Sequence, residues 1–416
     1  MKPHQLDLNI ENYKGKSATY SGGRGELFHD WFPYLEGFSS EFVIDIIRQR
    51  FNKPKSILEP FCGVGTTPIT LLQQNISCGY CEVNPFLLEL TSLKLSSLKL
   101  NKQDTEKLIS DLSQLENQIK ISLKKVEPNN ELDTSYKDSF EDAEYISEPN
   151  KALILKLKTI ENEIIREKLK PYFRIIVSTC LLKASLLRRA GDVRYKTKRE
   201  LEKGVPNIIN LVSEKIHLIQ NDLAKLFNMS EYGDAFLVSE DAKELKNYRG
   251  KNFDGVITSP PYLNGTNYIR NTKLELWYLG YLKDKKDLRT YRNNVVTSAI
   301  NDVTKESGAS VVEEANDIVR ELQSNCYDKR IPKMAAAYFE DMKLVAKGIH
   351  KDVNKNSPVC IDIGDSIYGG VHIPTHKILS DIFISSGFKT EDSVILRKRY
   401  SNKGHPLTQR LLFFRK

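Results

Sequence analysis

A strand, a glycine-rich turn, a helix and a second strand follow one another between Lys55 and Leu100, and this order constrains the fold more than any other feature. The first strand is SILEP, the turn is FCGVGTT, and the helix PITLLQQN carries Pro68 in its first turn, where proline is tolerated. The second strand, ISCGYCEV, leads into another helix that begins near Phe86. Two strands joined through a helix lie parallel in one sheet. The sequence therefore predicts an α/β fold with a Rossmann-like, mostly parallel sheet.

This alternation of strands and helices is interrupted by a long segment and then resumes. Residues 101–230 repeat Leu, Ile and Lys at helical spacing, which predicts a largely helical insertion. Within it, residues 127–150 hold eight acidic residues and one lysine, a composition typical of an exposed loop or linker. We therefore expect residues 1–100 and 231–416 to form the two parts of one α/β domain. Further strands are expected at DAFLV, FDGVITS, SPVCIDIGD, FKTEDSVILRKRY and RLLFFRK.

Charge and hydropathy narrow the class of protein. The 416-residue chain has a formal net charge of +8, which suits an anionic partner such as a nucleic acid. It contains no apolar run of about 18 residues, so no transmembrane helix is expected. Its polar N-terminal segment lacks the apolar stretch of a signal peptide. We therefore expect no membrane association, and a cytoplasmic location with activity at the bacterial nucleoid.

The cysteines and histidines do not form a metal-binding pattern. Cys78 and Cys81 make a CxxC inside the second predicted strand, but no second pair of ligands accompanies them at zinc-site spacing. We expect these cysteines to be buried free thiols. His372 and His376 are four residues apart, yet Pro374 between them disfavours a shared helical face. The sequence therefore predicts no metal ion.

The turn that follows the first strand has the features of a cofactor site. In open parallel sheets, ligands bind at the carboxyl ends of the strands. Gly63 and Gly65 lack side chains, so the backbone can approach a ligand closely. The turn has neither the third glycine of a dinucleotide motif nor the Gly-Lys-Ser/Thr of a phosphate loop. Glu82 ends the second strand and can accept both hydroxyls of a ribose. Such an acid without a phosphate loop indicates an adenosyl cofactor that has no phosphates, although a structural turn in another α/β fold would show the same glycines.

A second motif, Ser259-Pro260-Pro261-Tyr262, directly follows the predicted strand 253–258. The two prolines end the strand and hold Ser259 at the same ligand-binding edge of the sheet. An exocyclic amine of a base is a poor nucleophile, because its lone pair is delocalised into the ring. A hydroxyl and a carbonyl, from Ser259 and Pro260, can accept its two N–H groups and localise that lone pair. Tyr262 offers a flat face for an extruded base. A plain proline turn is the alternative.

Both motifs resemble those of the amino-methyltransferases, a family of DNA-modifying enzymes that methylate exocyclic amines. EPFCGVG is similar to the family's cofactor motif D-P-F-x-G-x-G, with Glu59 in place of Asp, and TSPPY is similar to its catalytic motif (D/N/S)-P-P-(Y/F/W). The resemblance implies S-adenosylmethionine as the donor, an activated sulfonium, so that alignment of nitrogen, methyl and sulfur is the main task. Residues 31–43 resemble the segment that covers the methionine end of the donor. The implied cofactor-binding residues are Phe61, Gly63, Gly65, Thr66, Glu82 and, as the adenine-contacting acid, Asp234.

The first residue of the catalytic motif indicates the target base. Serine at this position, Ser259, resembles the cytosine-N4 branch, whereas Asp or Asn is commoner in adenine-N6 enzymes. The implied reaction is site-specific methylation of N4 of a flipped-out cytosine in double-stranded DNA, with a cognate restriction endonuclease as partner. The alternatives are adenine-N6 methylation of DNA, guanine-N2 methylation of RNA or tRNA, and a catalytically silent nucleic-acid-binding subunit.

Two basic segments are candidates for contact with a nucleic-acid backbone. Residues 183–203 contain eight Lys or Arg against three acids, and a second basic turn, 397–405, follows a predicted strand. A solvated helix end is the alternative interpretation of the first segment. Target recognition belongs either to the insertion 101–230 or to a second insert at about 282–332. The candidate residues are Arg188, Arg189, Arg194, Lys196, Arg397, Arg399 and Lys403.

Overall fold

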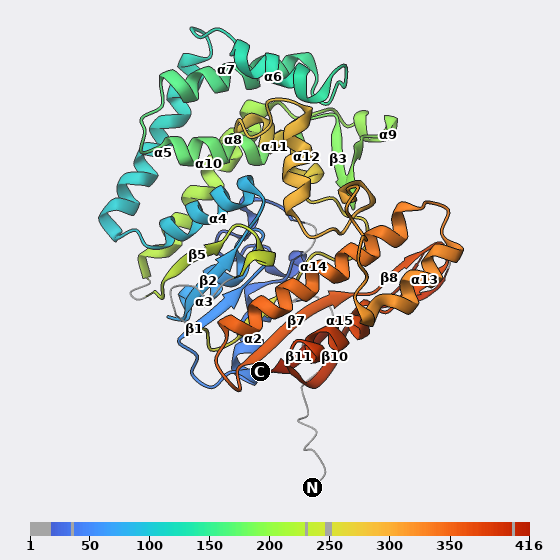
Figure 1. Cartoon of the computed structure of the whole chain (residues 1–416). Helices are drawn as coiled ribbons and strands as arrows, with labels where there is room; N and C mark the ends of the chain where they lie inside the picture. Colours follow the sequence, from blue (N-terminus) through green and yellow to red (C-terminus); the bar gives the residue numbers. More distant parts are fainter. Residues whose placement is uncertain (1–17, 35–36, 229–231, 246–251, 402–403) are drawn as a thin grey trace.

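The computed structural model describes residues 18–34, 37–228, 232–245, 252–401 and 404–416 (Figure 1). Its centre is a seven-stranded sheet in the order β10-β11-β7-β6-β1-β2-β5. Every strand of this sheet overlaps a segment for which the sequence predicts one, so the expected α/β fold is confirmed. The strands are β1 Ser56–Glu59, β2 Ser77–Cys81, β5 Ala235–Ser239, β6 Val256–Thr258, β7 Pro358–Gly364, β10 Lys389–Tyr400 and β11 Pro406–Arg415.

Most of the sheet is parallel, and one edge is antiparallel. β5, β2, β1, β6 and β7 pair in parallel, whereas β11 runs antiparallel to both β7 and β10. The carboxyl ends of the parallel strands therefore meet at one edge of the sheet. β1 and β6 are direct neighbours, so the glycine-rich turn after β1 and the tetrapeptide after β6 lie next to each other.

Side chains of the sheet alternate between two hydrophobic cores, one on each face. Ile57 and Leu58 on β1 point into opposite cores, and so do Leu411 and Leu412 on β11. This period of two is what a strand covered on both faces produces. The first core is covered by α2 Ser40–Arg50, α3 Thr66–Gln73 and α4 Pro85–Leu98, and the second by α13 Asn316–Asn325, α14 Arg330–Asp352 and α15 Thr375–Ser385.

The insertion forms a helical layer that continues the first core. Its buried face includes Leu112 of α5 and Phe173 of α8, which belong to the same cluster as Ile57 of the sheet. Figure 1 shows these helices, cyan to green, above the blue strands β1 and β2. They are α5 Lys102–Ser122, α6 Asn130–Phe140, α7 Glu148–Glu163, α8 Lys170–Ala184 and α10 Ile208–Ala224.

The prediction of a loop over residues 127–150 is wrong, because α6 lies within it. The Asn129 side chain caps this helix by accepting from the backbone N–H of Leu132 at 2.8 Å. Leu132 and Tyr136, four residues apart, are both buried against the helical layer. The acidic residues therefore occupy the outer face of an amphipathic helix, and the two buried side chains decide its conformation.

A β-hairpin that the sequence did not predict extends from the helical layer after α8. Its strands are β3 (Leu187–Ala190) and β4 (Asp192–Tyr195), joined at Gly191, whose φ of 79° suits a tight turn. The hairpin contains residues 187–195 of the basic segment 183–203, including Arg188, Arg189 and Arg194. Within the described residues, no helix is long and apolar enough to cross a membrane. The second insert consists mainly of α12 Lys285–Asn294, the short 3-10 turns η7 Ile300–Asp302 and η8 Glu313–Ala315, and α13.

Candidate active site and the adjoining cleft

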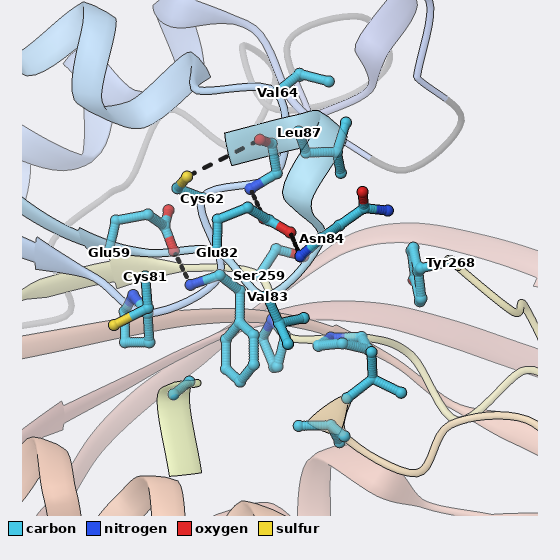
Figure 2. A pocket seen from close by; sticks show the side chains of 18 of the residues that line it. Glu59, Cys62, Val64, Cys81, Glu82, Val83, Asn84, Leu87, Ser259 and Tyr268 are labelled. Carbon is cyan, nitrogen blue, oxygen red and sulfur yellow. Dashed lines mark hydrogen bonds between the residues drawn. The ribbon is translucent and has the colours of Figure 1, made fainter. Parts of the chain in front are cut away.

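A cavity lies at the carboxyl ends of β1, β2, β5 and β6, where the sequence places both motifs. Its lining includes Glu82 after β2, and Ser259 after β6 (Figure 2). The structure therefore brings together the two motifs, which are about 190 residues apart in the chain. Of the predicted residues, the cavity is lined by Phe61, Gly63, Thr66, Glu82, Ser259, Pro260, Pro261 and Tyr262.

Side chains of α4 hold the glycine-rich turn in place. Thr91 donates its hydroxyl to the Gly63 carbonyl at 3.1 Å, and the buried Lys94 ammonium donates to the Val64 carbonyl at 2.8 Å. Gly65 has a φ of 85°, and a Cβ there would lie 2.9 Å from the Thr91 side chain. Gly65 itself does not line the cavity. A glycine is required at position 65 because of the backbone conformation and the close packing against Thr91. This corrects the prediction that Gly65 contacts the cofactor.

Glu82 occupies the position expected of a ribose-binding acid. One carboxylate oxygen accepts from the backbone N–H of Gly63 and the other from that of Asn84, both at 2.8 Å. These bonds tie β2 to the glycine-rich turn and orient the carboxylate in the cavity. Burial raises the pKa of Glu82 to about 7, which the two backbone donors oppose.

Glu59 is a site residue that the sequence interpretation noted only as a departure from the family's Asp. Its buried carboxylate accepts from the Phe61 backbone N–H at 3.0 Å, from the Thr67 hydroxyl at 2.8 Å and from the Thr258 hydroxyl. Thr258 is the residue before Ser259, so Glu59 joins the cofactor turn to the catalytic strand. Burial raises the pKa of Glu59 to about 7. Glu59 could have been identified from the sequence, because it occupies the acid position of the cofactor motif.

The tetrapeptide after β6 is oriented by β7 and α14. The Ser259 hydroxyl donates to the Asp362 carbonyl at 3.2 Å, and Tyr338 donates its hydroxyl to the Pro261 carbonyl at 3.0 Å. The Tyr262 ring lies against Gly364, where an added Cβ would come within 3.1 Å of it. Ser259 thus uses its proton within the protein, which directs its oxygen lone pairs to other donors.

The prediction that Asp234 contacts the cofactor is wrong. Asp234 precedes β5 and lies at its amino end, the opposite edge of the sheet from the cavity. Its side chain is 79% exposed and pairs with Lys99 at 2.7 Å. Asp241, which follows β5 at the carboxyl end, lines the cavity instead. The sequence alone does not distinguish Asp234, before the strand, from Asp241, after it. Because β5 pairs in parallel with β2, only Asp241 lies at the edge of the sheet where the cavity is.

A larger cleft of about 1030 Å³ adjoins the cavity, and the two share Tyr34, Gly37 and Tyr262 in their linings. The helical insertion, the N-terminal segment and the C-terminal strands all contribute to its walls. The two predicted basic segments therefore converge on one cleft, although about 200 residues separate them. Basic side chains that line it are Arg24, Lys183, Arg188, Arg189, Lys196, Lys215, Arg397 and Arg399.

The predicted basic residues differ in their surroundings. Arg188 and Arg194 are about half exposed and both pair with Glu200, and Arg194 does not line the cleft. Lys196 donates to the Ser185 carbonyl at 2.6 Å. Lys403 lies outside the described residues. The basic segments are therefore partly engaged within the protein, which sequence alone does not reveal.

Comparison with known proteins adds to this geometry. No protein-family model matches the chain. It is 24% identical to the Type II methyltransferase M.BsoBI of Geobacillus stearothermophilus over 95% of its length and 86% of that protein. It is also 24% identical to the Type II methyltransferase M.AvaI of a Nostoc strain, over 93% of its length and 84% of that protein. This chain is a methyltransferase, and it is similar to Type II methyltransferases over most of its length. Its methyl donor is S-adenosylmethionine.

Other matches are shorter or weaker. The Type II methyltransferase M.MvaI of Kocuria varians is 24% identical over 57% of the chain and 53% of that protein. Among solved structures, the rRNA methyltransferase AviRa of Streptomyces viridochromogenes covers 92% of the chain and 87% of that chain, with 9% identity and a TM-score of 0.32. A TM-score this low adds nothing to the assignment.

The residues of this methyltransferase's cavity fit the donor. Glu82 can accept ribose hydroxyls, Asp241 can accept the exocyclic amine of an adenine, and the open turn at Gly63 leaves backbone accessible. S-adenosylmethionine has no phosphates, in keeping with the absence of a phosphate-loop motif in the turn. When bound, it supplies an electrophilic methyl group.

Proposed function

We propose that this methyltransferase is an amino-methyltransferase that methylates double-stranded DNA at specific sites, on the exocyclic N4 amine of cytosine. One observation carries the proposal: Ser259 and Glu82 line one cavity, and that cavity adjoins a cleft lined by arginines and lysines. The cavity is suited to donor and base, and the cleft to the phosphate backbone. Relatives named Type II methyltransferases support a DNA substrate.

Ser259 and Pro260 are proposed to activate the amine. Because the Ser259 hydroxyl donates to the Asp362 carbonyl, its lone pairs are available to an N–H of the base. The Pro260 carbonyl would accept the second N–H. With both N–H groups engaged, the nitrogen lone pair localises and points toward the methyl group. The proton lost on methylation leaves from nitrogen to solvent, and alignment supplies most of the rate enhancement.

Tyr262 is proposed to hold the flipped base. It lines both the cavity and the cleft, so its ring lies where a base would pass from one to the other. Its packing against Gly364 limits its movement. Stacking on an aromatic ring contributes about 1–3 kcal/mol per base. This contribution offsets part of the cost of extracting the base from the duplex.

The helical insertion, with the β3–β4 hairpin, is proposed as the surface that contacts the duplex. Its residues Lys183, Arg188 and Lys196 line the cleft, opposite Arg397 and Arg399 of β10. None of the cleft's described lining residues comes from 282–332, whereas Asn294, Val295 and Val296 of that insert line the cavity. These placements favour the insertion 101–230 for backbone contact and the second insert for a role beside the base.

Methyl transfer to defined DNA tests the proposal. Purified protein is incubated with labelled S-adenosylmethionine and duplex DNA, and nucleosides from the digested product are separated by mass. We expect N4-methylcytosine at one sequence, and no product with Ser259→Ala. N6-methyladenine alone would overturn the cytosine assignment, and transfer to tRNA but not to DNA would overturn the substrate. Resistance of the methylated DNA to an endonuclease that cuts the same sequence would identify the restriction partner.

A further inference from the structure

Arg189 differs from the other arginines of the β3–β4 hairpin in being held inside the protein. Only 10% of its side chain is exposed, against 56% for Arg188 and 43% for Arg194. Its guanidinium donates to the Pro33 carbonyl at 2.7 Å and to the Asn271 carbonyl at 3.0 Å. The same group lies 3.8 Å from the buried Glu275 carboxylate. Arg189 is therefore engaged on several sides before any DNA arrives.

The two carbonyls belong to segments that border the active-site cavity. Pro33 precedes Tyr34, and Asn271 follows Tyr268 in the loop that leads away from the tetrapeptide. Both tyrosines line the cavity, with ring centroids 6.4 Å apart. Tyr34 lies over the glycine-rich turn, since a Cβ on Gly63 would be 3.7 Å from its ring. One guanidinium thus joins the two chain segments whose aromatic rings flank the donor.

Further contacts tie the hairpin to the same loop. Asn271 donates its side-chain amide to the Gly191 carbonyl at 3.2 Å, and Arg270 pairs with Asp192 at 2.8 Å. Thr272, the residue after Asn271, continues these contacts toward the donor site. Thr272 accepts from the Asn84 amide at 2.8 Å, and the Asn84 backbone N–H donates to the Glu82 carboxylate. Hydrogen bonds therefore run from the hairpin turn to the ribose-binding acid.

Arginine suits this place for a physical reason. Its planar fork presents several N–H donors in fixed directions, so it can satisfy two backbone carbonyls at once, whereas lysine acts as a single point charge. The Phe32 ring packs against the guanidinium at 4.9 Å, and the Glu275 carboxyl, whose pKa burial raises to about 7, lies 3.8 Å from it. A guanidinium whose N–H groups already donate to two carbonyls has few donors left for a phosphate.

We propose that Arg189 is a positioning residue for the donor site and not a phosphate contact. It holds the Tyr34 and Tyr268 segments together, and through them shapes the cavity around S-adenosylmethionine. The hairpin thus has an exposed basic surface that includes Arg188, and an inner residue that organises the active site. The phosphate half of this inference rests on the proposed DNA function, whereas the donor half does not.

Two substitutions of Arg189, with Arg188 as matched control, test the assignment. Arg189→Lys keeps the charge and removes the fork, and Arg189→Gln removes the charge. Calorimetry without DNA is expected to show S-adenosylmethionine bound about tenfold more weakly by both, since each loses one or more of the hydrogen bonds that hold the Pro33 and Asn271 carbonyls. Arg188→Gln is expected to leave donor affinity unchanged. Thermal unfolding confirms that each variant is folded.

The salt dependence of DNA affinity separates the two roles. Loss of a phosphate contact lowers the slope of log K against log salt by about one. We expect this decrease for Arg188→Gln and an unchanged slope for Arg189→Gln. Wild-type donor affinity in both Arg189 variants, or a lowered slope for Arg189→Gln without a change in donor affinity, would overturn the proposal.

A milder variant covers the case in which Arg189 substitutions fail to fold. Asp192→Asn removes the negative charge from the partly exposed pair with Arg270 that joins the hairpin to the loop, and its remaining amide oxygen can still accept from the Val193 backbone N–H. We expect donor affinity to fall about twofold to threefold. An Asp192→Asn variant with unchanged donor affinity would then overturn the proposal. If the wild-type protein bound no DNA, the donor measurements would still decide the role of Arg189.

Discussion

The active-site cavity and the cleft beside it are built on opposite principles. In the cavity, the acids Glu59 and Glu82 are at most 9% exposed, and their carboxylates accept backbone or hydroxyl protons at defined distances. In the cleft, Arg188 is 56% exposed and pairs with Glu200, which lies just after the hairpin in the chain. Chemistry on an amine requires alignment that buried hydrogen bonds maintain. Binding a polyanion requires charges that can exchange one partner for another.

This contrast predicts that single substitutions in the cavity have large and specific effects, and that those in the cleft have small and salt-dependent ones. Arg189 is the exception that joins the two regions, because it lines the cleft and organises the cavity. The expected effects range from a large loss of turnover at Ser259 to a small gain of DNA affinity at Glu200.

Ser259→Ala is expected to have the largest effect. Loss of the hydroxyl removes one acceptor for the amine, so kcat should fall about a hundredfold or more, while donor affinity stays within about twofold. Single-turnover kinetics and calorimetry measure the two quantities. Ser324→Ala, an exposed serine on α13, is the matched control and should behave as wild type. Normal turnover in Ser259→Ala would eliminate the role assigned to this hydroxyl.

Glu82→Gln is expected to weaken donor binding by about tenfold to a hundredfold. The amide cannot accept from Gly63, Asn84 and a ribose at once, and it loses the charge that strengthens those bonds. Calorimetry measures the dissociation constant, and circular dichroism checks the fold. Asp234→Asn is the control, because Asp234 pairs with Lys99 at the far edge of the sheet. That variant should bind the donor normally, and equal losses in both would contradict the assignment.

The raised pKa of Glu82 predicts opposite effects of pH on donor affinity and on stability. Donor affinity should fall as pH drops below about 7, because the protonated carboxyl no longer accepts two hydroxyls. Folding stability responds the other way. The folded state holds a proton that the unfolded state, with the ordinary value of 4.5, releases, so this group's contribution to stability is lost as pH rises from 4.5 through 7. A donor dissociation constant that does not change between pH 6 and 8 would contradict the predicted loss of donor affinity at low pH. In Glu82→Gln, the dependence of donor affinity on pH should be absent.

Arg397→Gln should reduce DNA affinity by about fivefold and leave donor affinity unchanged. Arg397 lines the cleft on β10, opposite the hairpin. If it contacts a phosphate, the slope of log K against log salt should fall by about one. Fluorescence anisotropy at several salt concentrations gives that slope. An unchanged slope would place the duplex elsewhere on the surface.

Glu200→Gln is expected to have the smallest effect and the opposite sign. Glu200 pairs with both Arg188 and Arg194 on an exposed surface, and those arginines hold its pKa well below the ordinary value. Exposed pairs contribute little, so their release should raise DNA affinity by only about twofold to threefold. Anisotropy at low salt measures the gain. A loss of affinity would show that Glu200 orders the hairpin, through its cap on Thr197.

Much of the fold and of the site was predictable from local patterns. The βαβ unit from β1 to β2, the later strands and the position of Ser259 after β6 all follow from short runs of apolar residues and from prolines. Residues 127–150 were misassigned because acidic composition outweighed two apolar residues, Leu132 and Tyr136, whose burial depends on the surrounding helices. Asp234 was misplaced because sequence order does not state which end of a strand faces the ligand.

The sequence by itself determined the parallel sheet, the donor class and the place of the Ser259–Tyr262 tetrapeptide after a strand, since each depends on residues that are neighbours in the chain. Only the tertiary structure decided what lies beside that site. It brought the basic segments near 190 and 398 into one cleft, and it turned Arg189 inward while Arg188 stayed exposed. Two adjacent arginines in a strand face opposite sides, and which side is the interior depends on elements far away in the sequence.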